Sequence, residues 1–326
     1  MPNAMRKELY HNATQNAAIV DLSDRAYIDV KGADARKFLN GILTNNIATL
    51  QGATGCYACL CTPKGKMIAD LYCYTCGDTF GIECSAALKP IILETLKKYI
   101  IFQKVELVDQ SEKWGACGVI GPKAREIVSQ KIPKLPEKNF EYIYTEWEGF
   151  KLWIICKERW GLPGFELWTN REHLPLLCNL PAGRQGRGLG GGRLGLPVLD
   201  KETQEILRIE SATPLFGVDM DENSIPQEAG LYNALSFNKG CYVGQEIIAR
   251  LEHRGHVGKK LVQIKLDGNT VPNPKEKIFS TPGDEIGYIT SACFSPKFGA
   301  PLALGYMRYA SLEQKQVKVG NQNGSI

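Results

Sequence analysis

The sequence predicts an α+β fold that ends in a small β-barrel, and two patterns support this prediction. Up to about residue 255, amphipathic helical stretches alternate with short apolar, strand-like runs, which is typical of helices packed on largely antiparallel sheets. After His256 the strand-like runs follow one another across turns that contain Pro and Gly, as in a small closed barrel. With 326 residues, 44% hydrophobic and 23% charged, the chain is long enough for about two or three domains.

The expected elements can be placed in chain order from their periodicity. Between 88 and 102, for example, Leu88, Ile92 and Leu96 fall on one helical face, and lysines fall elsewhere. The expected helices are 34–41, 88–102, 123–131 and 199–210. The expected strands are 17–30 in pieces, 55–62, 70–76, 114–120, 141–145, 151–156, 260–266, 287–290, 300–306 and 316–319. Residues 181–195 are rich in Gly and Arg, so we expect a flexible linker or surface insert there.

Composition and charge restrict the class of protein. A net charge of +4, from 39 basic and 35 acidic residues, is too small to indicate direct nucleic-acid binding. The first residues lack the features of a secretory signal, and no apolar run approaches the roughly 18 residues needed to cross a bilayer. We therefore expect a cytoplasmic protein that does not associate with membranes, and we expect a monomer.

Eleven cysteines are well below the density of a secreted disulfide scaffold, so we expect reduced thiols. Six of them cluster between Cys56 and Cys84, and Cys56-x-x-Cys59 and Cys73-x-x-Cys76 have the spacing of metal ligands. If both segments are strands, however, residues three apart point to opposite faces and cannot chelate one ion. We favour strands with buried thiols, and a metal assay would decide the question. A metal at His253-x-x-His256 is a weaker alternative.

The most unusual stretch is Lys239-Gly-Cys-Tyr-Val-Gly-Gln-Glu246. It combines a cation, a thiol, a phenol, an amide and a carboxylate, and a core would need none of these polar groups. Its two glycines allow a sharp turn or a close approach of the backbone to a ligand. Upstream, Arg208 and Glu210 enter an apolar run, where they should meet each other or a ligand, because an unpaired buried charge is costly.

This octapeptide resembles the signature of the YgfZ-type folate-binding proteins, which are relatives of the aminomethyltransferase (T protein) of the glycine cleavage system. Other landmarks follow in the family's order over nearly the whole chain. They are Phe38-Leu39, Leu43-Thr-Asn45, Thr62-Pro-Lys-Gly-Lys66, Leu207-Arg-Ile-Glu210, Pro214-Leu-Phe-Gly-Val-Asp219, Ile225-Pro-Gln-Glu228 and Ile286-Gly-Tyr-Ile-Thr290.

The resemblance implies a three-lobed ring around a central pocket for tetrahydrofolate or a folate derivative, with a C-terminal barrel. It implies a folate-binding region at 1–255, made of two interleaved lobes (about 1–50 with 196–255, and 51–180), and a barrel at 256–326. It also implies partners among iron-sulfur proteins or their assembly factors, including tRNA-modifying enzymes.

By the same resemblance, Glu210 would bond the pterin edge and Asp70 would occupy the position of the T protein's key aspartate. Lys239, near the expected glutamate tail, together with Arg208 and Tyr242, would complete the folate contacts. Cys241 would be the working thiol.

Two departures from the T protein favour the YgfZ-type interpretation. Ala69 stands where the T protein usually has a second aspartate beside the one matching Asp70, and Cys241 supplies a thiol where the T protein tends to have an acidic or neutral residue. A thiol can carry out ligation, redox or nucleophilic chemistry that a carboxylate cannot. The leading hypothesis is a tetrahydrofolate-binding accessory protein for assembly or repair of iron-sulfur enzymes. The alternative is an aminomethyltransferase-like enzyme that transfers a one-carbon unit to tetrahydrofolate, with Asp70 acting on the reacting amine.

Overall fold

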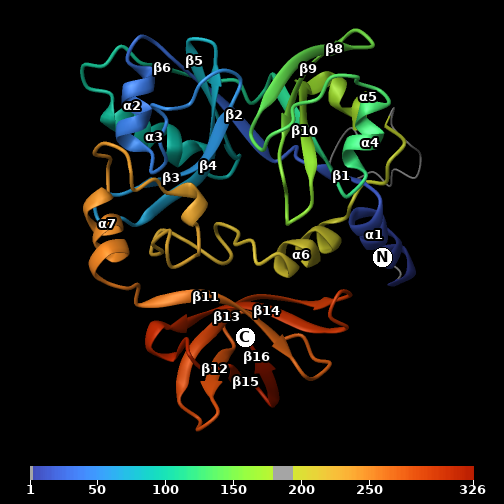
Figure 1. Ribbon diagram of the computed structural model, residues 1–326, viewed down its shortest axis with the longest axis vertical. Coiled ribbons are helices and arrows are strands. Elements are labelled where there is room, and N and C mark those ends of the chain that lie inside the picture. The colour runs from blue at the N-terminus through green and yellow to red at the C-terminus, as the bar shows by residue number, and fades with distance from the viewer. Residues whose placement is uncertain (1–2, 179–193) are drawn as a thin grey trace. The chain divides into compact units, whose positions relative to one another are not determined.

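The computed structural model describes residues 3–178 and 194–326 (Figure 1). The insert predicted at 181–195 falls almost entirely on residues 179–193, outside the described residues. The chain divides into two compact units, the first made of residues 1–40, 46–58 and 71–204, and the second of 41–45, 59–70 and 205–326. The predicted α+β class and the C-terminal barrel are confirmed. The domain boundaries expected from the resemblance, a folate-binding region at 1–255 and a barrel at 256–326, stay a prediction.

Two five-stranded sheets are built from the first ten strands, in the orders β3-β4-β5-β2-β6 and β1-β7-β10-β9-β8. Their strands are β1 (Ala18–Asp21), β2 (Arg25–Lys31), β3 (Gly55–Cys61), β4 (Met67–Cys76), β5 (Thr79–Ser85), β6 (Glu106–Asp109), β7 (Trp114–Ile120), β8 (Tyr142–Trp147), β9 (Phe150–Cys156) and β10 (Gly164–Asn170). The accompanying helices are α1 (Asn3–Gln15), α2 (Ala35–Ile42), α3 (Lys89–Tyr99), α4 (Ala124–Ser129) and α5 (Leu174–Cys178).

The apolar alternation of the strands places a hydrophobic core on one face of the second sheet. Val119, Ile154 and Leu167 are fully buried there, together with Val128 of α4 and Leu177 of α5. Burial of such side chains stabilises a fold by about 1.5–3 kcal/mol each.

A network of buried charges crosses the first compact unit. Lys157 Nζ lies 2.7 Å from Glu83 and 3.1 Å from Glu166, and it sits 3.3 Å from the centre of the Tyr72 ring. Arg25 pairs with Glu83 at 2.8 Å, and Arg159 pairs with Glu166 at 2.5 Å. Three cations therefore share two carboxylates. Burial would raise the pKa of the Glu166 carboxyl, but Lys157 and Arg159 outweigh it and lower that pKa to about 2.

Cys117 of β7 and Cys178 of α5 form a disulfide, so the expectation of reduced thiols is wrong for this pair. The two residues are 61 positions apart in the sequence, and only the packing of α5 against β7 brings them together. No local spacing motif could have indicated this pair.

The second compact unit ends in a closed barrel with the strand order β11-β14-β13-β12-β15-β16 (Figure 1). Its strands are β11 (Lys259–Leu266), β12 (Lys277–Ser280), β13 (Glu285–Ser295), β14 (Ala300–Arg308), β15 (Gln316–Val319) and β16 (Gln322–Ser325). Inward-pointing residues such as Ile264, Ile289 and Val317 form its core. Helices α6 (Lys201–Glu210) and α7 (Gln245–Arg254) precede the barrel. In the part of the chain that is described, no helix has the length and apolar character to cross a membrane.

Candidate functional site

The octapeptide forms the turn that leads into helix α7. Gly244 immediately precedes the helix and has a φ of +88°, which L side chains rarely adopt. A Cβ added there would lie only 2.7 Å from the carbonyl oxygen of Thr62. Because both the backbone angle and the space require glycine, Gly244 lets the motif pack closely on the turn at 62–65. The two glycines of the octapeptide predict a turn here, but helix α7 was not predicted, because a glycine stands where a helix usually has a polar capping residue.

The Lys239 side chain connects the start of the motif to a second turn, at residues 43–45, by hydrogen bonds. Its ammonium donates hydrogen bonds to the carbonyl oxygens of Leu43 (2.8 Å) and Asn45 (2.6 Å). It also lies 4.9 Å from the centre of the Tyr242 ring, so these two predicted site residues do come together. Lys239 therefore has a positioning role in addition to the folate contact predicted for it.

Tyr242 and Asp70 both approach a pair of buried thiols. Burial raises the pKa of Cys61 to about 12, and it raises the pKa of Cys59 as well, with Cys61 and the carboxylate of Asp70 adding to the effect. The pKa of Tyr242 is also raised, first by burial and then by Cys61 and Cys59. Cys59 thus lies close enough to Tyr242 and to the half-buried Asp70 to interact electrostatically with both. The sequence analysis did not assign these thiols to the site, because it treated them only as possible metal ligands or core residues.

Cys241 is solvent-exposed, whereas the other free cysteines of the described chain are buried or half-buried. The neighbouring Gly240 leaves open space on its own side. A reagent or a partner protein can therefore reach the Cys241 thiol. This accessibility distinguishes it chemically from Cys59 and Cys61.

Arg208 and Glu210 do not pair with each other. The sequence suggested either this pairing or contact with a ligand, and the first of these expectations is wrong. They are two positions apart on α6 and therefore point in different directions. Arg208 instead bonds Glu205 (2.9 Å), Asp219 (2.5 Å) and the carbonyl oxygen of Thr213 (2.9 Å). Burial alone would lower its pKa, but Glu205 and Asp219 raise it above the ordinary value.

Asp219 is the polar residue that the sequence analysis missed. Its Oδ2 accepts from Arg208 and from the N–H of Leu215 (3.0 Å), and its Oδ1 accepts from the hydroxyls of Thr290 (2.5 Å) and Ser291 (2.7 Å). It is almost completely buried. A signal for it was present, because Asp219 is the carboxylate that ends the apolar run starting at Pro214.

Glu210 is half-buried at the C-terminal end of α6. Its Oε1 accepts hydrogen bonds from the Ser295 hydroxyl and from the backbone N–H of Lys297 (3.2 Å), both contributed by the barrel. The Gln263 amide holds the end of the helix through the carbonyl oxygens of Ile209 (2.6 Å) and Glu210 (3.2 Å). The carboxylate of Glu210 is therefore held in one orientation while part of it stays accessible to solvent.

The predicted cysteine strands are confirmed as β3 and β4, with Cys56, Cys59 and Cys73 buried in them. Within the described residues, no group of three or more His, Cys, Asp or Glu side chains could hold a metal ion. The ring of His256 stacks on Tyr309 at 4.0 Å, and His253 packs edge-on against Phe237 at 6.1 Å. These histidines therefore have aromatic packing partners.

All of the predicted site residues, from Asp70 to Tyr242, lie in the second compact unit. The chain matches the GCVT N-terminal domain over residues 2–239 and the glycine cleavage T-protein C-terminal barrel domain over residues 259–326. An aminomethyltransferase of Caldanaerobacter subterraneus subsp. tengcongensis is 29% identical over 323 residues, which are 96% of this chain and 81% of that protein.

Two further comparisons agree with this match. An aminomethyltransferase of Thermotoga maritima is 27% identical over 319 residues, which cover 96% of this chain and 82% of that protein. The crystal structure of glycine cleavage system aminomethyltransferase T from Bartonella henselae matches with a TM-score of 0.83 at 19% identity. The match covers 98% of this chain and 87% of that one, so the two proteins share the fold. With both of its domain models matched along nearly the whole chain, the protein belongs to the glycine cleavage T-protein family.

Proposed function

We propose that the protein binds tetrahydrofolate and acts on a one-carbon unit in an aminomethyltransferase-like reaction. The names of its relatives favour this function over the accessory role that the motif suggested first. The structural observation that supports it most is Glu210, a half-buried carboxylate held in one orientation by Ser295 and Lys297. A carboxylate placed in this way can accept hydrogen bonds from the N–H groups at the edge of a pterin.

Asp70 would then act on the reacting amine. A half-buried carboxylate can accept or orient an amine proton when the substrate lies within hydrogen-bond distance. Arg208 supports the site through Asp219, and Lys239 and Tyr242 support it by fixing the motif next to the turn at 41–45. In this proposal, tetrahydrofolate is a substrate that receives the one-carbon unit.

The Glu210→Ala variant tests the folate contact. We expect its affinity for tetrahydrofolate to fall by about 10- to 100-fold, because hydrogen bonds to a charged group contribute about 1.5–3 kcal/mol. Isothermal titration measures this loss, and Glu222→Ala, which changes an exposed carboxylate of the same compact unit, is the matched control. A wild-type protein without affinity for tetrahydrofolate would refute both this function and the accessory role described next.

A second function is supported by the exposure of Cys241. We propose as the alternative that the protein is a YgfZ-type accessory factor, in which the folate-bound protein presents this thiol during assembly or repair of iron-sulfur enzymes. An accessible thiol is not needed to bind a pterin, but it suits contact with a client protein. Transfer of a one-carbon unit from an aminomethyl donor to tetrahydrofolate by the purified protein, with the amine released as ammonia, would favour the enzyme if Asp70→Asn abolishes it. Transfer indistinguishable from the uncatalysed rate would favour the accessory factor.

Cys241→Ala separates the thiol from the folate site. We expect this variant to bind tetrahydrofolate like the wild type and yet fail to restore iron-sulfur enzyme activity in a deletion strain. Cys156→Ala removes a half-buried thiol instead and should restore that activity fully. Equal rescue by both variants would remove Cys241 from the mechanism.

A further inference from the structure

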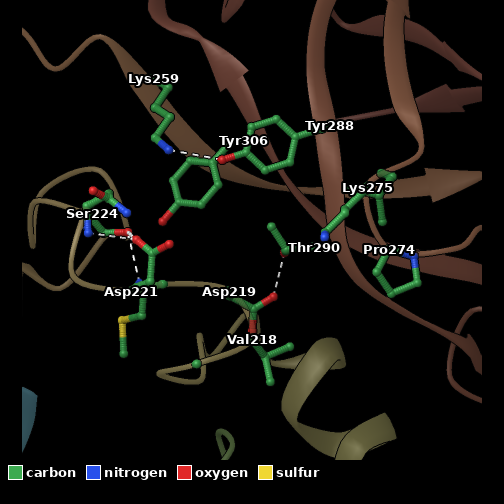
Figure 2. Close-up of a pocket in the computed structure, with 14 residues that line it drawn as sticks. Val218, Asp219, Asp221, Ser224, Lys259, Pro274, Lys275, Tyr288, Thr290 and Tyr306 are labelled. Atoms are coloured by element: carbon green, nitrogen blue, oxygen red, sulfur yellow. Dashed lines mark hydrogen bonds between the residues drawn. The ribbon is translucent and has the colours of Figure 1, made fainter.

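A cavity of about 420 Å³ lies within the second compact unit, between the loop at 217–224 and the barrel (Figure 2). The barrel contributes Lys259 from β11, Tyr288 from β13 and Tyr306 from β14, and Lys275 lies in the turn before β12. Apolar parts of the lining come from Val218, Met220, Pro274 and Ile289. Its volume is in the range of small-molecule sites, which combine apolar walls with a few polar groups.

The carboxylates that line this cavity already accept hydrogen bonds from the protein. Both oxygens of Asp219 accept two hydrogen bonds each from the protein. Asp221 Oδ1 accepts from the N–H of Asn223 (2.8 Å) and the hydroxyl of Ser224 (3.2 Å), which closes the turn that it begins. These carboxylates therefore leave little capacity to bind a cation.

The basic and phenolic groups, in contrast, have unused hydrogen-bonding capacity. Lys259 Nζ donates to the Tyr288 hydroxyl at 3.0 Å and lies 4.3 Å from the centre of the Tyr306 ring, which uses one of its three donors. Lys275 is exposed, and no hydrogen bond or ion pair of its ammonium occurs among the described residues.

Tyr306 is only 2% exposed, and its hydroxyl has no hydrogen bond of normal geometry within residues 3–178 and 194–326. Ser224 lowers the pKa of Tyr306, but the Ser224 hydroxyl already donates to Asp221 Oδ1 and accepts from the Asp221 N–H. Burial, the larger effect, raises the pKa of Tyr306, so the phenol stays neutral and able to donate. A buried hydroxyl without a partner destabilises the fold, and a ligand that accepts its hydrogen bond would remove this cost.

We propose that this cavity binds a small organic carboxylate with a planar, apolar body and a second polar group. Lys259 would hold the carboxylate, Tyr288 and Tyr306 would contact the planar body, and the Tyr306 hydroxyl would bond the second polar group. Lys275 adds positive charge to the lining. Glu210 is not among the residues that line the cavity, and the proposal does not depend on the function proposed above.

The test uses 4-hydroxybenzoate as the probe for the full chain, measured by isothermal titration. We expect saturable binding by the wild type, about tenfold weaker binding by Tyr306→Phe and at least as large a loss in Lys259→Gln. Lys318→Gln, which removes an exposed lysine of β15 outside the cavity, should bind like the wild type. The neutral analogue 4-hydroxybenzamide should bind at least tenfold more weakly than 4-hydroxybenzoate.

Melting temperature separates a ligand role of Tyr306 from a structural one. Tyr306→Phe removes an unpaired buried hydroxyl, so the variant should melt at or above the wild-type temperature while it binds the probe more weakly. Glu210→Ala should lose tetrahydrofolate affinity and retain the probe. Absence of probe binding by the wild type, equal binding of the neutral analogue, a lower melting temperature of Tyr306→Phe, or displacement of the probe by saturating tetrahydrofolate would each overturn the proposal.

Discussion

Glu166→Gln is expected to lower the free energy of unfolding by about 3–5 kcal/mol, the cost typical of breaking a buried charge pair. The variant leaves Lys157 and Arg25 with Glu83 as their shared carboxylate, and it removes the ion-pair partner of Arg159. Burial already lowers the pKa of Lys157, and the loss of Glu166 removes the group that offsets this most. Urea denaturation of the purified protein measures the change.

Because three cations share two carboxylates in this network, removing one cation should cost less stability than removing one carboxylate. Lys157→Met should cost less than Glu166→Gln, because Arg25 still pairs with Glu83 and Arg159 still pairs with Glu166. Lys151→Gln, at an exposed position of β9, the strand that ends just before Lys157, should change stability by less than about 0.5 kcal/mol. A larger loss of stability in Lys157→Met than in Glu166→Gln would contradict the prediction that the network depends more on this carboxylate than on this cation.

The pH dependence provides a second measurement of the same prediction. The pKa of Glu166 in the folded protein, about 2, lies below the ordinary value of about 4.3 expected in the unfolded chain. A carboxyl with a lowered pKa stabilises the fold above its unfolded pKa, and this stabilisation is lost as the pH falls towards the folded value. The difference in stability between wild type and Glu166→Gln should therefore narrow between about pH 5 and pH 2.

Asp219→Ala is expected to destabilise the protein by a similar amount, about 3–5 kcal/mol. The variant removes a buried partner of Arg208 and also the acceptor of the Thr290 and Ser291 hydroxyls, so that α6 and the barrel lose a shared anchor. Differential scanning calorimetry should show a lower melting temperature. Because Glu210 is the last residue of the same helix, affinity for tetrahydrofolate should fall as well.

Asp221→Ala is the control for this variant, two residues along the same loop. Its side chain is exposed and closes a local turn, so its removal should cost about 1 kcal/mol. If Asp219→Ala proved as stable as Asp221→Ala, this would show that the Arg208–Asp219 pair does not anchor the helix.

Local patterns were sufficient for most of the secondary structure. Short strand-like runs between turn residues located β7, β11 and β14, and a face of apolar residues located α3. Helix α7 was missed because a positive-φ glycine precedes it, and β10 was missed because its apolar run is interrupted by Glu166. That carboxylate is buried only because Lys157 and Arg159 meet it in three dimensions.

The sequence by itself determined the fold class, the barrel and the family, because hydrophobic periodicity and a run of ordered motifs are properties of the chain alone. It also singled out Glu210 and Cys241 as candidate site residues, which stays a prediction. Only the tertiary structure paired Arg208 with Asp219 instead of Glu210, joined Cys117 to Cys178, and brought Lys259, Tyr288 and Tyr306 around one cavity. Pairings of this kind depend on the distance between side chains that are far apart in sequence, and local periodicity carries no information about that distance.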